Sequence, residues 1–269
     1  MSRLIICNWK QFPDTIGQAE AFISDFLKAI KKDGLEDTIK KNKIILLTPF
    51  IYTSQISQSI ESIKDLVEIG AQDVSKFNQG AFTGEISSKM LKSVDVKYVL
   101  IGHSERRLNF KETNEDINLK INNCMHYGLK PIICIGENAR IKTETSNSFR
   151  IKKIIFTQLN EIFKCIKEEN LKDVHIAYEP IWSISSTKDR VDANPEDIEH
   201  MILNIRFWLD NRFGEKTSKQ IKILYGGSIN KSNIKNFQTT IIKDGFLIGK
   251  ASTNVKELIL AIKQLKTIK

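Results

Sequence analysis

Eight short apolar segments rich in aliphatic, often β-branched residues recur along the chain. They are Leu4–Trp9, Lys43–Thr48, Val67–Gln72, Lys97–Gly102, Pro131–Gly136, Val174–Glu179, Ile221–Gly226 and Gly245–Gly249. Their apolar residues are largely continuous instead of alternating with polar ones, which is typical of parallel strands buried on both faces. Stretches long enough for a helix separate them, so strand and helix alternate about once every 34 residues.

Helical periodicity is clear in three of the intervening stretches. Residues 15–32 and 148–168 each place their large apolar side chains on one broad face. Residues 195–213 begin with a proline and two acidic residues and end before a glycine, which are helix start and stop signals. In contrast, Asp73–Ser87 is rich in turn-forming residues and is predicted to be a long loop.

Eight strand–helix units in 269 residues match the size of a (β/α)8 barrel. An open, doubly wound sheet is the rival architecture, but its first strand–helix turn usually carries a G-x-G-x-x-G motif, which this chain lacks. The chain also lacks a linker, a low-complexity segment and near-identical repeats. The sequence therefore predicts an α/β protein whose residues 1–269 form one (β/α)8 barrel domain.

Composition narrows the classes of function. The apolar runs are far shorter than the roughly 18 residues that span a bilayer, and the N-terminus lacks a signal-peptide pattern. The 4 cysteines are scattered without a C-x-x-C pair, which favours free thiols in a reducing compartment over disulfides or a zinc site. We expect a cytoplasmic protein that does not bind membranes.

The formal net charge of +9 could indicate a nucleic-acid partner. However, acidic residues interrupt the densest basic segment, residues 28–43, and the other lysines are spread over predicted helix faces without a basic stripe interleaved with aromatic residues. Frequent Ile and Asn beside Lys suggest a coding bias that places lysines on solvated surfaces. We therefore expect no nucleic-acid partner.

Polar residues follow several of the predicted strands. In (β/α)8 barrels the active site lies at these carboxyl ends. The two-residue period of a strand directs Asn8 and Lys10 to the same face, toward the barrel mouth. His103 directly follows the fourth segment, and Glu179 ends the sixth. Each residue alone has an ordinary structural explanation, but an amide, an ammonium, an imidazole and a carboxylate around one mouth together predict proton-transfer chemistry.

Glycine-rich turns follow the last two predicted strands, at Gly226-Gly227-Ser228 and Gly249-Lys250. Barrels commonly bind phosphate at this position, because backbone N–H groups can approach its oxygens closely. A Walker A motif is absent, and no His or carboxylate spacing such as H-E-x-x-H indicates a metal site. The sequence therefore predicts a phosphorylated substrate, with no metal and no cofactor.

The order and the amino-acid sequences of these motifs resemble those of the triosephosphate isomerase family. The resemblance covers essentially the whole chain and is carried by Asn8-Trp9-Lys10, Gly80–Glu85, His103–Arg107, Cys134–Glu137, Ala177–Trp182, Tyr225–Ser228 and Asp244–Gly249. It implies a TIM barrel that interconverts dihydroxyacetone phosphate and D-glyceraldehyde 3-phosphate through an enediol(ate), a reaction of glycolysis and gluconeogenesis.

The resemblance also implies roles for individual residues. Glu179 would be the base that moves a proton between adjacent carbons, and neutral His103 would donate a hydrogen bond to the enediolate oxygen. Lys10 and Asn8 would contact substrate oxygens, and Glu105 would hold Lys10 or pass a proton. The implied phosphate contacts are Ser185, Ser228, Gly249 and Lys250.

A lid, a dimer and a set of supporting residues follow from the same resemblance. Residues 180–193 would close over the phosphate and exclude water. The loop around Phe82-Thr83-Gly84 inserts into a second subunit in this family, which implies a homodimer. Cys134 and Glu137 would support the site, and ion pairs that tie loops together would involve Arg106, Arg107 and Glu112.

Three departures from the family pattern lie near the phosphate. Ser183–Thr187 lacks the two glycines usual in the lid, and residues 188–195 are longer than usual by about three residues, which loop-closure entropy tolerates. Lys250 also stands where a second glycine is usual. They leave two alternatives open: an isomerase of a four-carbon ketose phosphate, and a non-catalytic phosphate-binding barrel.

Overall fold

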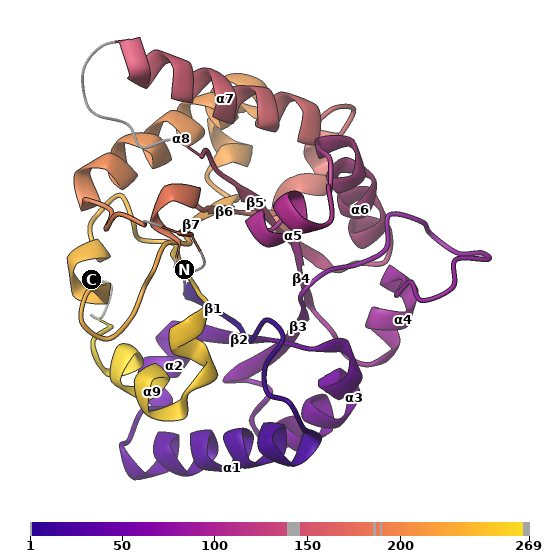
Figure 1. The fold of residues 1–269 in the computed structure, drawn as a ribbon, viewed down its shortest axis with the longest axis vertical. Helices are drawn as coiled ribbons and strands as arrows, with labels where there is room; N and C mark the ends of the chain where they lie inside the picture. Colours follow the sequence, from indigo (N-terminus) through magenta and orange to yellow (C-terminus); the bar gives the residue numbers. More distant parts are fainter. Residues whose placement is uncertain (1, 139–145, 185–186, 189, 266–269) are drawn as a thin grey trace.

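The computed structural model describes residues 2–138, 146–184, 187–188 and 190–265. Within them, parallel strands close into a barrel in which each strand pairs with the next in sequence and the last pairs with the first (Figure 1). The strands are β1 (Arg3–Asn8), β2 (Asn42–Thr48), β3 (Val67–Ala71), β4 (Tyr98–Ile101), β5 (Lys130–Ile135), β6 (His175–Tyr178), β7 (Lys222–Tyr225) and β8 (Gly245–Ile248). The predicted (β/α)8 fold is confirmed.

Helices surround the barrel (Figure 1). The α-helices are α1 (Ile16–Lys32), α2 (Glu36–Lys41), α3 (Phe50–Ser59), α4 (Ser88–Ser93), α5 (Ser104–Asn109), α6 (Asn114–His126), α7 (Ser146–Ile162), α8 (Pro195–Ser218) and α9 (Val255–Lys263). The 3-10 segments are η1 (Glu61–Ile63), η2 (Glu168–Asp173), η3 (Ile181–Ser183), η4 (Ile234–Phe237) and η5 (Lys250–Thr253).

The predicted strands match the observed ones to within one residue at each end. The helix predicted over residues 15–32 begins after Thr15, whose side chain accepts a hydrogen bond from the Gln18 N–H. One predicted helix end is wrong: α7 stops at Ile162, six residues before the predicted end, and Cys165 soon after takes a left-handed φ of 60°. The helix end predicted before Gly214 is present as a break within α8, because Gly214 takes a non-helical conformation with a φ of 77° and a second helical stretch follows it.

Alternate residues of each strand enter two different buried layers. Leu4 and Ile6 belong to the cluster inside the barrel, whereas Ile5 and Cys7 belong to the cluster between the barrel and its helices. Both strand faces are therefore apolar, which explains the continuous apolar runs. The same alternation directs Asn8 to the inside of the barrel at its carboxyl end.

The loop from Asp73 to Ser87 contains neither helix nor strand, as predicted, and projects from the side of the barrel (Figure 1). Buried ion pairs hold its base: Lys120 Nζ lies 2.6 Å from Asp73 Oδ1 and also pairs with Glu112, and Arg106 Nε lies 2.8 Å from Asp73 Oδ2. Burial raises the pKa of Asp73. The ion pairs expected for Arg106 and Glu112 are thus present.

Arg107 instead acts through hydrogen bonds. It donates to the backbone carbonyls of Gly102 (2.8 Å) and Cys134 (3.1 Å) and to the side chain of Asn114 (2.7 Å). No ion pair of Arg107 is found in the part of the chain that the structure describes, so the predicted ion pair is replaced by these hydrogen bonds. Through them Arg107 links the ends of β4 and β5, from which site residues project.

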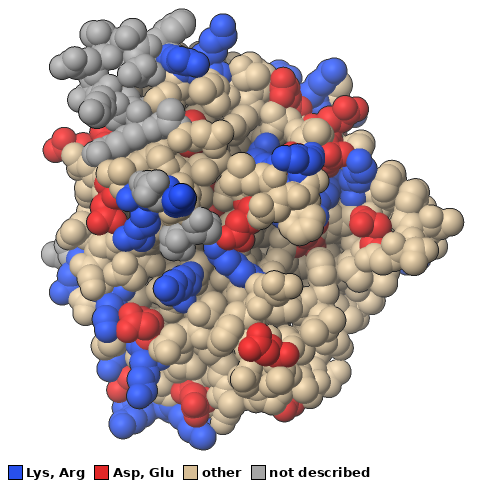
Figure 2. Space-filling model, viewed as in Figure 1, with Lys and Arg blue, Asp and Glu red and all other residues tan. Residues whose placement is uncertain are grey.

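Basic and acidic side chains are interspersed over the face shown in Figure 2. This distribution agrees with lysines on solvated helix surfaces. Among the described helices, none combines the length and the apolar composition needed to cross a membrane.

Candidate active site

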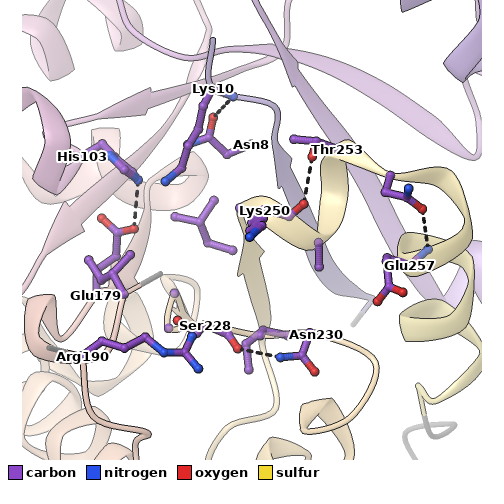
Figure 3. A pocket seen from close by; sticks show the side chains of 18 of the residues that line it. Asn8, Lys10, His103, Glu179, Arg190, Ser228, Asn230, Lys250, Thr253 and Glu257 are labelled. Carbon is purple, nitrogen blue, oxygen red and sulfur yellow. Dashed lines mark hydrogen bonds and ion pairs between the residues drawn. The ribbon is translucent and has the colours of Figure 1, made fainter. Parts of the chain in front are cut away.

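A cavity of about 480 Å³ opens at the carboxyl end of the barrel (Figure 3). Its lining brings together most of the residues expected from the sequence, which are Asn8, Lys10, His103, Glu179, Ser228, Gly249 and Lys250. Glu105 reaches the site through Lys10. Ser185 lies outside the described residues.

Glu179 is the buried carboxylate of the cavity, with only 3% of its surface exposed. It directly follows β6, two residues after Ala177 of the inner cluster, and its Oε1 lies 3.3 Å from His103 Nε2 (Figure 3). Its Oε2 has no hydrogen-bond partner within the described ranges. A Cβ at Gly226 would come within 2.8 Å of Glu179 Cγ, so this glycine leaves room for the carboxylate.

His103 faces Glu179 because of a turn at Gly102. Gly102 has a φ of 73°, and a Cβ there would lie 2.5 Å from the Ile117 side chain. His103 then caps α5, and its Nδ1 accepts the Glu105 N–H at 3.2 Å. Since an accepting Nδ1 carries no proton, this contact favours a neutral ring with its proton on Nε2, the atom that faces Glu179.

Lys10 is held in a left-handed conformation with a φ of 55°. Its N–H donates to Asn8 Oδ1 (3.0 Å), and its carbonyl accepts from Gln72 Nε2 (2.8 Å). Its ammonium donates to Glu105 Oε1 at 2.5 Å. This conformation is unfavourable for a residue with a side chain, so these contacts position Lys10 at the cavity.

Cys134 and Glu137 lie beside the site, at the end of β5. Glu137 accepts hydrogen bonds from the Tyr178 hydroxyl and the Trp182 indole N–H, both at 2.9 Å, and burial raises its pKa to about 7. Burial, and then the nearby Glu179 carboxylate, raise the pKa of the Cys134 thiol. Glu137 thereby connects β5 to the first residues of the segment predicted as a lid.

The expected phosphate side of the cavity is formed by the turns after β7 and β8. Ser228 Oγ donates to the Ser183 carbonyl at 2.7 Å, and Asn230 Nδ2 donates to the Ser228 carbonyl at 3.3 Å. Lys250 begins η5 and has no left-handed φ, so its side chain replaces the usual glycine without backbone strain. A Cβ at Gly249 would lie 3.3 Å from Lys10 Cε, so a larger residue there would crowd the lysine.

Sequence reasoning did not identify several residues that line the cavity. They are Ile184, Arg190, Ile229, Asn230, Ser232, Leu247, Ala251, Thr253, Asn254 and Glu257, whereas Gly226 and Gly227 belong to the turn already predicted to bind phosphate. Arg190 is the cation among them and points into the cavity in Figure 3. The sequence signal that could have identified Arg190 is that it is a basic residue in the part of the predicted lid segment that is longer than usual.

A metal-binding cluster is not found in the described part of the chain, where no group of three or more His, Cys, Asp or Glu side chains could hold an ion. The polar groups of the cavity are instead acid–base and hydrogen-bonding groups. With a closed barrel and these groups at the carboxyl ends of its strands, the chain falls in the class of (β/α)8 barrel enzymes.

Comparisons with known proteins identify the family. The family model described as triosephosphate isomerase matches residues 3–265. Proteins named triosephosphate isomerase are 35% identical in Caldanaerobacter subterraneus subsp. tengcongensis (94% of this chain and 95% of that protein) and 37% identical in Dictyoglomus thermophilum (93% and 94%). One from a Nostoc species is 36% identical (94% and 95%). The chain belongs to the triosephosphate isomerase family.

Proposed function

We propose that this protein interconverts dihydroxyacetone phosphate and D-glyceraldehyde 3-phosphate as an intramolecular aldose–ketose isomerase of glycolysis and gluconeogenesis. Membership of the family supports this activity. The observation that carries the proposal is the buried Glu179 carboxylate, 3.3 Å from His103 Nε2 in a cavity that Asn8 and Lys10 also line.

Proton transfer between the two carbons is assigned to Glu179. Its carboxylate takes a proton from the carbon beside the carbonyl, and the electrons of the broken C–H bond form the enediolate. A proton then moves from the hydroxyl oxygen to the enediolate oxygen, and the carbon-bound proton, or one exchanged from solvent, returns from Glu179 to the neighbouring carbon. A buried carboxylate with one oxygen unengaged by the described residues suits a base that works out of contact with water.

His103, Lys10 and Asn8 stabilise the charge that develops on the substrate oxygens. The Nε2 proton favoured by the Glu105 N–H contact allows His103 to donate a hydrogen bond without carrying charge. The Lys10 ammonium supplies fixed positive charge, and the Asn8 amide supplies polar contact. Such preorganised groups stabilise a transition state most effectively in a water-excluded site.

We assign the phosphate contacts to Ser185, Ser228, Gly249 and Lys250, with residues 180–193 as the lid. Three of these contacts line the cavity, and the hydrogen bond from Ser228 to the Ser183 carbonyl joins the β7 turn to the lid segment. Ser185 is assigned on the family motif alone.

A homodimer through the Phe82-Thr83-Gly84 loop is part of the proposal. The loop projects from the barrel, and Phe77 and Phe82 stack with ring centroids 3.8 Å apart while both stay exposed. Buried ion pairs at its base stabilise it for contact with a second copy. Sedimentation equilibrium should show a dimer, and Phe82→Ser should weaken it; a monomeric wild-type protein would contradict the proposed dimer.

Free thiols at all four cysteines support a cytoplasmic location.

A coupled assay with both triose phosphates, with and without a phosphate-bearing enediolate analogue, tests the activity. We expect turnover in both directions and competitive inhibition by the analogue. Faster turnover of a four-carbon ketose phosphate would favour the paralogous isomerase. Phosphate binding without turnover of any sugar phosphate would favour a non-catalytic barrel.

A further inference from the structure

Arg190 lies at the edge of the cavity, in the segment that is longer than the family usually has. The N–H of the next residue, Val191, donates to the Trp182 carbonyl at 3.0 Å and fixes the backbone beside it. Figure 3 shows the Arg190 side chain extending into the cavity in the direction of Ser228. The backbone of Arg190 therefore belongs to the segment proposed as the lid, and its guanidinium faces the side of the cavity where we expect the phosphate to bind.

The guanidinium is only weakly engaged. Arg190 Nη2 lies 3.0 Å from Asp192 Oδ1, but the side chains are 39% and 83% exposed. Exposed ion pairs of this kind contribute little, because water and salt screen them. An anion in the cavity can therefore recruit the remaining N–H groups of Arg190 at small cost.

The other cavity charges leave positive charge available on this side. Lys10 is already engaged by Glu105, and Glu257 is paired with Lys231 at 2.8 Å. Lys250 has no ion pair within the described parts of the chain, and its side chain lines the same cavity. Arg190 and Lys250 are thus the cations left to meet an anion beyond Lys10.

We propose that Arg190 is a phosphate-binding residue of this active site, which contacts the phosphoryl group from the lid segment while Lys250 contacts it from the turn after β8. The proposal rests on the proposed function in one respect, namely that the bound anion is the phosphoryl group of the substrate. A planar guanidinium binds phosphate oxygens through two parallel N–H bonds, which suits it to this task.

The binding of inorganic phosphate, measured by calorimetry, and the KM for glyceraldehyde 3-phosphate test the proposal. A lost charge-assisted hydrogen bond should make Arg190→Ala bind phosphate about tenfold more weakly and raise its KM by about tenfold. Arg190→Lys should recover part of the loss. Lys263→Ala is the matched control, because Lys263 is 38% exposed and lies 2.9 Å from Asp33, yet does not line the cavity.

Turnover of unphosphorylated glyceraldehyde separates phosphate binding from a merely structural role. Its kcat/KM should be unchanged in Arg190→Ala, because this substrate has no phosphoryl group to contact. Wild-type phosphate affinity in Arg190→Ala, or an equal loss of turnover on both substrates, would overturn the proposal. If the wild-type protein turned over no triose phosphate but Arg190→Ala still lost phosphate affinity, the proposed function would fail and the phosphate contact would stand.

Discussion

Shortening Glu179 by one methylene group tests the assigned base most directly. Glu179→Asp keeps the charge but withdraws the carboxylate by about 1.5 Å, one C–C bond length. The backbone cannot follow to compensate: the Glu179 N–H donates to the Ile135 carbonyl at 2.8 Å, and a Cβ at Gly136 would already lie 1.9 Å from the Glu179 carbonyl oxygen. The present distance of 3.3 Å to His103 Nε2 therefore lengthens.

The size of the effect follows from this displacement. A misplacement of about 1 Å in a reacting group costs about 100-fold in rate, so 1.5 Å predicts a fall in kcat of roughly 100- to 1000-fold. This corresponds to about 3–4 kcal/mol of transition-state stabilisation. The KM should change little, because the groups assigned to phosphate binding are untouched.

The coupled triose phosphate assay measures this prediction at saturating substrate. Glu196→Asp is the matched control: Glu196 is exposed in the first turn of α8, so the same chemical change there should leave kcat unaltered. A Glu179→Asp protein with kcat within about threefold of wild type would refute the assignment of Glu179 as the base.

Three other substitutions probe the site, its supporting residues and the base of the projecting loop. Gly226→Ala puts a methyl group 2.8 Å from Glu179 Cγ, so kcat should fall by about tenfold or more while the protein stays folded. Lys120→Met leaves two buried carboxylates facing each other and should lower the free energy of unfolding by about 3 kcal/mol, measured by urea denaturation. Burial raises the pKa of Glu137 to about 7, so the folded protein holds a proton there that the unfolded chain loses above its ordinary pKa near 4.5. Its contribution to stability should therefore fall by on the order of 3 kcal/mol between pH 4.5 and 7, and Glu137→Gln should remove that fall.

Each of these predictions has a contrary outcome. Wild-type kcat in Gly226→Ala would show that the carboxylate has room to spare. A Lys120→Met protein as stable as wild type would mean that the ion pairs at the base of the projecting loop contribute little. If Glu137→Gln and wild type lost stability in parallel between pH 4.5 and 7, another group would cause the loss.

Strand positions were predictable because their cause is local. A strand buried on both faces must be apolar throughout, and that requirement is visible in the sequence to within one residue. Helix ends were less predictable. The apolar periodicity of α7 continues to Ile166, which is buried, but the helix itself ends at Ile162. The apolar periodicity shows which residues are buried, but a buried residue need not belong to a helix.

The site was predictable to the extent that strand geometry controls it. Asn8 and Glu179 enter the barrel mouth because the two-residue period continues from Ile6 and from Ala177. His103 does not follow that rule, because it lies three positions, an odd number, after Leu100, which already faces inward. The left-handed turn at Gly102 is what reorients it.

The sequence by itself therefore determined the barrel, the family and the chemical identity of the groups proposed as catalytic, because apolar runs and strand-end motifs are local patterns. Tertiary structure decided which groups touch. The pairing of Lys10 with Glu105 joins residues 95 positions apart, and the placement of Arg190 at the cavity depends on how its loop packs against Trp182. Such contacts arise only when the closed barrel brings the ends of different strands to one mouth.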